Sequence, residues 1–261
     1  MAGTLKTRID GAVGWLIFSN VERHNAVTYD MWCDMPRVLG EFDSNPAVRV
    51  IAVTGDGAKA FVAGADISEF EKRRGSPDAS AEYNRASQAG QESLSKTVKP
   101  TVAVIRGICF GGGVGLALAC DMRIAADDGR FCVPAARLGL GYQYGGIKRL
   151  SEVVGPAYAA EIFATARRYN AAEALRMGLV NHVVPATELD AFAAEYLGQI
   201  TENAPLTVAA AMRAVDEVLK TERDRDVAAV DAMVDRCFAS EDYKEGRTAF
   251  MEKRKPVFKG R

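Results

Sequence analysis

The alternation of short β-branched runs with helical patterns constrains the fold of this chain more than any other feature. Runs rich in Val, Ile and Thr, bounded by turn residues, predict strands at 13–18, 48–55, 101–107 and 121–127. Between them, a helix that Thr28 can cap is predicted over 29–42, and another over 79–97. Strands that alternate with helices in this way predict a layered α/β body.

The last third of the chain has a different pattern, because the strand signals fade after about residue 155. Apolar periodicity predicts helices at 170–178, 187–202, 206–220, 225–239 and 242–254. One face of the fourth helix carries Val227, Val230, Val234 and Phe238. We therefore expect residues 1–200 to form the core, and residues 201–261 to form a helical region that packs on the core or on a neighbouring subunit.

The composition excludes several classes of protein. Lys and Arg total 33 against 34 Asp and Glu, so we expect no basic face that attracts nucleic acid or an anionic membrane. The longest apolar stretch, 107–120, is too short and too Gly-rich to span a bilayer, and no signal-peptide cleavage pattern follows the first residues. Five cysteines without C-x-x-C spacing argue against zinc and disulfides, so we expect no metal and a reducing, cytoplasmic location.

Two Gly-rich segments are candidates for ligand binding. The segment "GICFGGGVGLALA" (107–119) fails the G-x-G-x-x-G dinucleotide fingerprint, and "GDGAKA" (55–60) lacks the ending of a phosphate-binding P-loop. Gly111-Gly112-Gly113 lies between a predicted strand and a short helix, so it is either a tight turn or a helix start whose free N–H groups bind an oxyanion. The segment "AFVAGADISEF" (60–70) has the same two interpretations, with Asp66 able to cap the turn.

Taken together, several motifs resemble the crotonase (enoyl-CoA hydratase/isomerase) superfamily over essentially the whole chain. They are "AFVAGADISEF", "KPTVAVIRGICFGGGVGLALACDMRIAAD", "GGIKRLSEVVG", "ALRMGLVNHVVP" and "AFMEKRKPVFKGR". The resemblance implies a spiral of ββα units followed by a helical trimerisation region, assembled as a homotrimer or a dimer of trimers. It implies an acyl-coenzyme A thioester as substrate, no other cofactor, and an oxyanion hole made by the backbone N–H groups of Ala65 and Gly112.

The resemblance also implies where coenzyme A binds. The segment "ERHNAV" (22–27) matches the family's segment near the adenine and phosphates, and the tail matches positions that reach the nucleotide from a neighbouring subunit. The implied contacts are Arg23, Ala26, Ala63, Asp66, Ile67, Phe250 and Lys253. Without the resemblance, the residues themselves favour another interpretation, in which Arg23 and Lys253 are solvated side chains and Phe250 is a core residue. His24 and His182 are expected to be structural or exposed.

The chain departs from the family pattern at the positions that carry acid–base chemistry. Hydratases of this family have two glutamates where this chain has Gly115 and Ala135, and hydration of an enoyl thioester requires an acid and a base. Around Tyr142 the chain resembles the methylmalonyl-CoA decarboxylase branch, although Ala65 stands where that branch has a histidine. Decarboxylation produces the enolate directly, so no base is required.

Three hypotheses follow from this pattern. The first is a decarboxylase, or another lyase that is not a hydratase, in which Tyr142 either protonates the α-carbon or packs on a pocket wall. The second is a hydratase or isomerase that uses Glu69 or Tyr144, and the third is an acyl-CoA binder without catalysis. A Rossmann oxidoreductase is the remaining alternative. Arg137 is either a contact for a substrate carboxylate or a surface side chain.

Overall fold

The computed structural model describes residues 3–69 and 75–261. Its larger sheet has six strands in the order β1-β2-β3-β5-β7-β10. These strands are β1 (Thr4–Asp10), β2 (Val13–Ser19), β3 (Val50–Gly55), β5 (Thr101–Ile105), β7 (Met122–Ala126) and β10 (His182–Val184). From β2 onward neighbouring strands are parallel, and only β1 pairs antiparallel, with β2.

A smaller sheet lies beside the first and has four strands in the order β4-β6-β8-β9. They are β4 (Ala60–Val62), β6 (Ile108–Phe110), β8 (Arg130–Cys132) and β9 (Tyr169–Asn170). The chain therefore visits the large sheet, then the small sheet, then a helix, in three successive turns. This arrangement confirms the predicted α/β fold with a spiral of ββα units.

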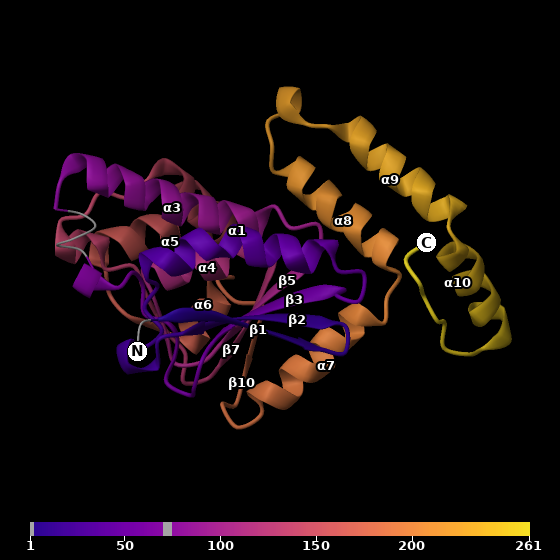
Figure 1. Cartoon of the computed structure of the whole chain (residues 1–261), viewed down its shortest axis with the longest axis horizontal. Helices are drawn as coiled ribbons and strands as arrows, with labels where there is room; N and C mark the ends of the chain where they lie inside the picture. The colour runs from indigo at the N-terminus through magenta and orange to yellow at the C-terminus, as the bar shows by residue number, and fades with distance from the viewer. Residues whose placement is uncertain (1–2, 70–74) are drawn as a thin grey trace.

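Helices pack against both sheets and bury their apolar side chains. They include α1 (Tyr29–Ser44), α3 (Pro77–Ser95), α4 (Gly112–Ala119), α5 (Tyr144–Thr165), α6 (Ala171–Arg176) and α7 (Leu189–Thr201). Figure 1 shows α1 and α3 together on one side of the sheet and α7 on the other. Trp32 and Met35 of α1 are buried in the larger apolar cluster. Ala193 and Leu197 of α7 belong to a second cluster, which includes Val50 of β3.

The helix boundaries follow the capping signals of the sequence. Thr28 accepts a hydrogen bond from the Met31 N–H at 3.3 Å, so α1 begins where predicted, although it continues to Ser44. Asn170 and Glu173 form a capping box at the start of α6. The sequence prediction lacks α5, because its apolar pattern is interrupted at Gly155, where the helix kinks. It also lacks β1, whose residues are mostly exposed, and β10, which has only three residues.

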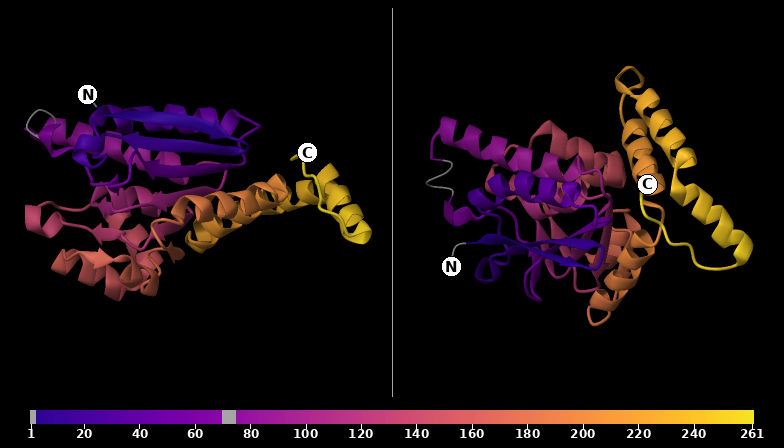
Figure 2. Two further views of the ribbon diagram at one scale, coloured as in Figure 1. Left: turned by 90° about the horizontal axis from the view of Figure 1, so that it is seen from below. Right: turned by 45° about the vertical axis from the view of Figure 1, so that its right-hand side comes forward.

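Three further helices project from the body, as both views of Figure 2 show. They are α8 (Pro205–Val218), α9 (Val227–Ala239) and α10 (Glu241–Glu252). Arg49 links this region to the body, because its guanidinium donates to the Thr201 and Phe258 carbonyls at 2.9 and 2.5 Å. No helix within residues 3–69 and 75–261 is long and apolar enough to cross a membrane.

Candidate active site

The two segments singled out in the sequence meet in space. Val27 forms a parallel bridge with Ala65, in which its N–H donates to the Gly64 carbonyl at 2.8 Å. The Asp66 N–H donates back to the Val27 carbonyl at 2.9 Å. Because the Gly64 carbonyl and the Asp66 N–H both face Val27, the N–H of Ala65 points away from Val27. Gly64 has φ +109°, which residues other than glycine rarely adopt, and this permits the turn.

The Gly112 amide lies beside the Ala65 amide. Gly112 is the first residue of α4, where helix N–H groups lack an acceptor within the helix. A Cβ placed on Gly112 would lie 3.7 Å from the Ala65 nitrogen. Neither N–H has a hydrogen-bond acceptor among the residues that the structure describes. Two free backbone donors, one of which begins a helix, can stabilise a negatively charged oxygen between them.

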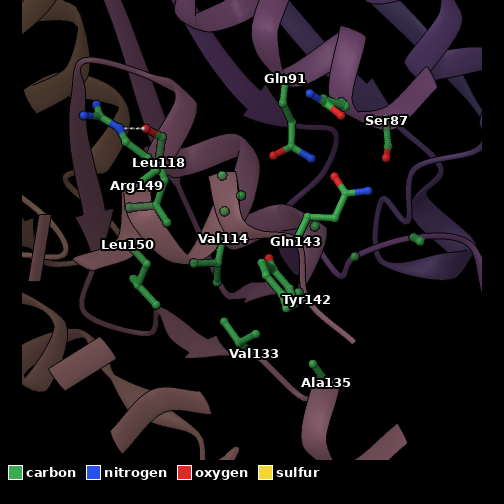
Figure 3. Close-up of a pocket in the computed structure, with 18 of the residues that line it drawn as sticks. Ser87, Gln91, Val114, Leu118, Val133, Ala135, Tyr142, Gln143, Arg149 and Leu150 are labelled. Carbon is green, nitrogen blue, oxygen red and sulfur yellow. Dashed lines mark hydrogen bonds between the residues drawn. The ribbon is translucent and has the colours of Figure 1, made fainter. Parts of the chain in front are cut away.

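These amides open onto a cavity of about 530 Å³. One wall is apolar and includes Val114, Leu118, Val133, Leu150 and Phe163. The facing wall is the polar side of α3, with Asn84, Ser87, Gln88 and Gln91. Figure 3 shows side chains from both walls around the same space. A cavity of this size, mostly apolar with a few polar groups, is typical of a small-molecule site.

Gly115 and Ala135, which stand where the resemblance implies two glutamates, both line this cavity. Ala135 is buried and Gly115 lies one helical turn beyond the free amides. A Cβ placed on Gly115 would lie only 2.9 Å from Oε1 of Gln91. The Gln91 carboxamide therefore occupies the space into which a side chain at position 115 would project.

Two carboxylates line the cavity among the described residues, and both are ion-paired. Glu92 pairs with Lys96 at 2.8 Å, and this hydrogen bond lowers the pKa of Glu92. Glu152 pairs with Lys148 and lies 3.9 Å from Arg149. Because Lys96 stabilises its ionised form, Glu92 is a poor proton donor near neutral pH.

Tyr142 is placed in this cavity as a partly buried phenol. Its ring packs edge to face on Phe163, with centroids 4.9 Å apart, and a Cβ on Gly146 would lie 2.6 Å from the ring. Burial raises the pKa of the Tyr142 hydroxyl. That hydroxyl has no hydrogen-bond partner within the described part of the chain, so it is free to meet a ligand.

Five of the seven residues predicted near coenzyme A lie together at the rim of the cavity. Arg23 is half exposed and bonds to Asp66 at 2.7 Å, while Ala63 and the exposed Ile67 line the cavity. Burial raises the pKa of the Asp66 carboxyl, but hydrogen bonds from Ser68 and the charge of Arg23 outweigh it, so the net shift is downward. Asp66 thus fixes Arg23 at the rim. Ala26 is buried beneath this pair and donates its N–H to the Arg23 carbonyl.

Other candidate residues lie away from the cavity. Phe250 is 82% exposed on α10, and Lys253 ends that helix, so within one chain neither lines the cavity. Tyr144 is 79% exposed outside it. Glu69 accepts a hydrogen bond from the Tyr29 N–H at 2.8 Å and does not line it. Phe70, the last residue of the "AFVAGADISEF" motif, is outside the described residues.

The remaining polar candidates are surface residues. His24, His182 and Arg137 are exposed and do not line the cavity. The sequence prediction missed Gln91 and Arg149, which do line it. Their signal was weak, because a helix with Gln and Ser at positions 87, 88 and 91 is typical of a solvated surface.

Comparison with known proteins places the fold in the crotonase superfamily. The Enoyl-CoA hydratase/isomerase family model matches residues 8–261. The structure superposes on an enoyl-CoA hydratase from Bacillus anthracis with a TM-score of 0.89 and 29% identity, covering 98% of this chain and 99% of that one.

Curated relatives agree with this. A short-chain-enoyl-CoA hydratase of Clostridium acetobutylicum is 36% identical, over 94% of each chain. A carnitinyl-CoA dehydratase of Proteus mirabilis is 40% identical, over 91% of each. The chain belongs to the enoyl-CoA hydratase/isomerase family, whose members are enzymes that act on acyl-CoA thioesters.

Proposed function

We propose that this enzyme stabilises the enolate of an acyl-CoA thioester and forms that enolate by decarboxylation rather than by proton abstraction. The observation that carries the proposal is the pair of free amides at Ala65 and Gly112, which face a cavity whose usual acid positions hold Gly115 and Ala135. Each oxyanion donor of this kind contributes roughly 10²–10³ in rate.

Decarboxylation requires no general base, because the bond that breaks supplies the electron pair of the enolate. The bond between C2 of a 2-carboxyacyl group and its carboxylate breaks, carbon dioxide leaves, and the electron pair forms the enolate, whose oxygen the two amides hold. C2 then takes a proton from the Tyr142 hydroxyl or from a water that it holds, and the phenolate regains a proton from solvent. The raised pKa of Tyr142 keeps this proton in place at neutral pH.

We assign the coenzyme A moiety to the rim formed by Arg23, Ala26, Ala63, Asp66 and Ile67. The exposed guanidinium of Arg23 suits a phosphate, and the exposed Ile67 side chain suits an apolar contact. The coenzyme is part of the substrate, and we propose no further cofactor and a cytoplasmic location.

We assign Phe250 and Lys253 to the coenzyme site of a neighbouring subunit. An apolar hollow between α8, α9 and α10 is lined by Val230, Val234 and Phe238, and the last two are exposed in a single chain. An exposed apolar region of this kind supports a homotrimer or a dimer of trimers.

Hydration or dehydration is the second candidate, because the relatives are named hydratase and dehydratase. Glu69 and Tyr144 lie outside the cavity, so they are poorly placed to supply its acid and base.

Incubation of the enzyme separately with methylmalonyl-CoA and crotonyl-CoA, with products followed by mass, tests the proposal. Loss of carbon dioxide from the first without hydration of the second is expected. Hydration of crotonyl-CoA at ordinary enzymatic rates would contradict it. Tight binding of both thioesters with no turnover would instead indicate an acyl-CoA binder.

A further inference from the structure

The acyl cavity has walls of opposite character. Residues Asn84, Ser87, Gln88 and Gln91 recur at helical spacing on the face of α3 that lines it. Opposite them lie apolar side chains such as Val114 and Leu118. A purely aliphatic acyl chain would remove water from the polar wall without replacing its hydrogen bonds, which is unfavourable.

Gln91 is the residue of this wall that meets α4, the helix that begins at Gly112. Its Oε1 lies 2.9 Å from the position of a Cβ on Gly115, and Figure 3 shows its carboxamide directed into the cavity. No other described residue hydrogen-bonds to this carboxamide, which can both donate and accept. By contrast, the Gln88 amide is already bonded to Glu92 at 2.7 Å.

The distance from the amides suits a substituent close to the thioester. Gly115 follows Gly112 by three residues, which corresponds to about 4.5 Å along a helix. An acyl group whose carbonyl oxygen lies at the Ala65 and Gly112 amides therefore places C2 and C3 near the Gln91 carboxamide.

The positions of the cations in the cavity affect how a substrate carboxylate would be held. Lys148 and Arg149 are the cations that line the cavity among the described residues. Arg149 donates its Nε–H to the Leu118 carbonyl, six residues along α4 from Gly112, or about 9 Å. A neutral amide near C2 can orient a carboxylate without neutralising it, whereas a cation there would stabilise the ground state and slow carbon dioxide loss.

We propose that Gln91 is a specificity-determining residue that hydrogen-bonds a carboxylate or hydroxyl substituent on C2 or C3 of the acyl group. The inference rests on the proposed function only in that the thioester oxygen lies at the two amides. The enzyme then prefers acyl-CoA substrates with a polar group close to the thioester over plain alkyl ones.

Calorimetric binding of three freshly prepared thioesters, none with a carboxylate on C2 that could be lost as carbon dioxide, tests this preference. They are succinyl-CoA, which carries a carboxylate on C3, 3-hydroxybutyryl-CoA, which carries a hydroxyl there, and butyryl-CoA, which carries neither. The wild type should bind the first two more tightly than butyryl-CoA. Gln91→Leu should weaken 3-hydroxybutyryl-CoA by roughly five- to tenfold and succinyl-CoA by at least about tenfold, leaving butyryl-CoA unchanged or tighter.

Two further variants show whether a change in affinity comes from the Gln91 carboxamide or from general disruption of the fold. Gln91→Glu should weaken succinyl-CoA more than 3-hydroxybutyryl-CoA, because two carboxylates repel while a hydroxyl can still donate. Gln199→Leu, at an exposed glutamine on α7, is the matched control and should change none of the three affinities. Equal affinities in the wild type, or an unchanged ratio in Gln91→Leu, would overturn the role of Gln91. Neither result depends on decarboxylation, which the methylmalonyl-CoA assay measures separately.

Discussion

Replacement of Gly113 by alanine should damage the oxyanion site without touching the substrate. Gly113 follows Gly112 in α4 but does not line the cavity. A Cβ at position 113 would lie 2.1 Å from the Val62 carbonyl oxygen. Ordinary contact with a Cβ begins at 3.4 Å, so α4 and β4 must separate by about 1.3 Å. Val62 leads directly into the Ala65 turn, so this separation moves the two amides apart.

The expected loss is large because oxyanion stabilisation depends on distance. A misplacement of about 1 Å can cost roughly 10²-fold in rate, and complete loss of one donor roughly 10²–10³. We therefore expect Gly113→Ala to lower the kcat for methylmalonyl-CoA by about 10²-fold. The overpacking itself should destabilise the fold by about 1–3 kcal/mol, which is small enough to leave a folded enzyme.

The assay combines turnover with a direct probe of the amides. The ¹³C shift of the carbonyl of bound butyryl-CoA reports polarisation by the two N–H groups, and it should move toward its value in water. Gly40→Ala is the matched control, because a Cβ at that helical glycine of α1 meets nothing within 4 Å. If Gly113→Ala keeps both wild-type turnover and the wild-type carbonyl shift, the close packing of α4 on β4 does not set the donor geometry, and the reasoning is refuted.

Three other changes have defined outcomes. Tyr142→Phe should lower the kcat for decarboxylation by about 10²-fold if the hydroxyl delivers the proton, with little change in thermal midpoint, and unchanged kcat would leave the ring only a packing role. Glu217→Gln should remove a contribution to folding stability that is present near neutral pH and disappears in acid. A hydrogen bond from Lys220 and the Asp226 N–H lower the pKa of Glu217 from 4.5 to about 2, so its contribution is complete above pH 4.5 and is lost as the pH falls toward 2. Urea titrations from pH 6 to 2 should show a flatter pH dependence in the variant, and parallel curves would contradict this. In the proposed trimer or hexamer, Phe250→Asp should shift sedimentation toward single chains. An unchanged sedimentation coefficient would place this side chain outside the interface.

The amino-acid sequence alone determined the class of fold and pointed to the two Gly-rich segments that line the cavity. The strands around Val53 and Val104 are dense β-branched runs, and the cap at Thr28 is local chemistry, so short windows were sufficient to predict them. The Gly-rich turns could also be predicted, because a run of glycines is recognisable within a short window. The absence of acids at Gly115 and Ala135 is a property of the chain itself, read through its resemblance to the family.

Tertiary structure alone decided which of these features act together. Ala65 and Gly112 are 47 positions apart, and only the packing of α4 on β4 brings their amides into one site. The position of Gln91 in the cavity was equally hidden, because a glutamine on a polar helix has the same local pattern whether it faces solvent or a cavity. Local propensity depends on neighbours in the sequence, whereas a site depends on contacts between distant segments, which burial of the whole core establishes.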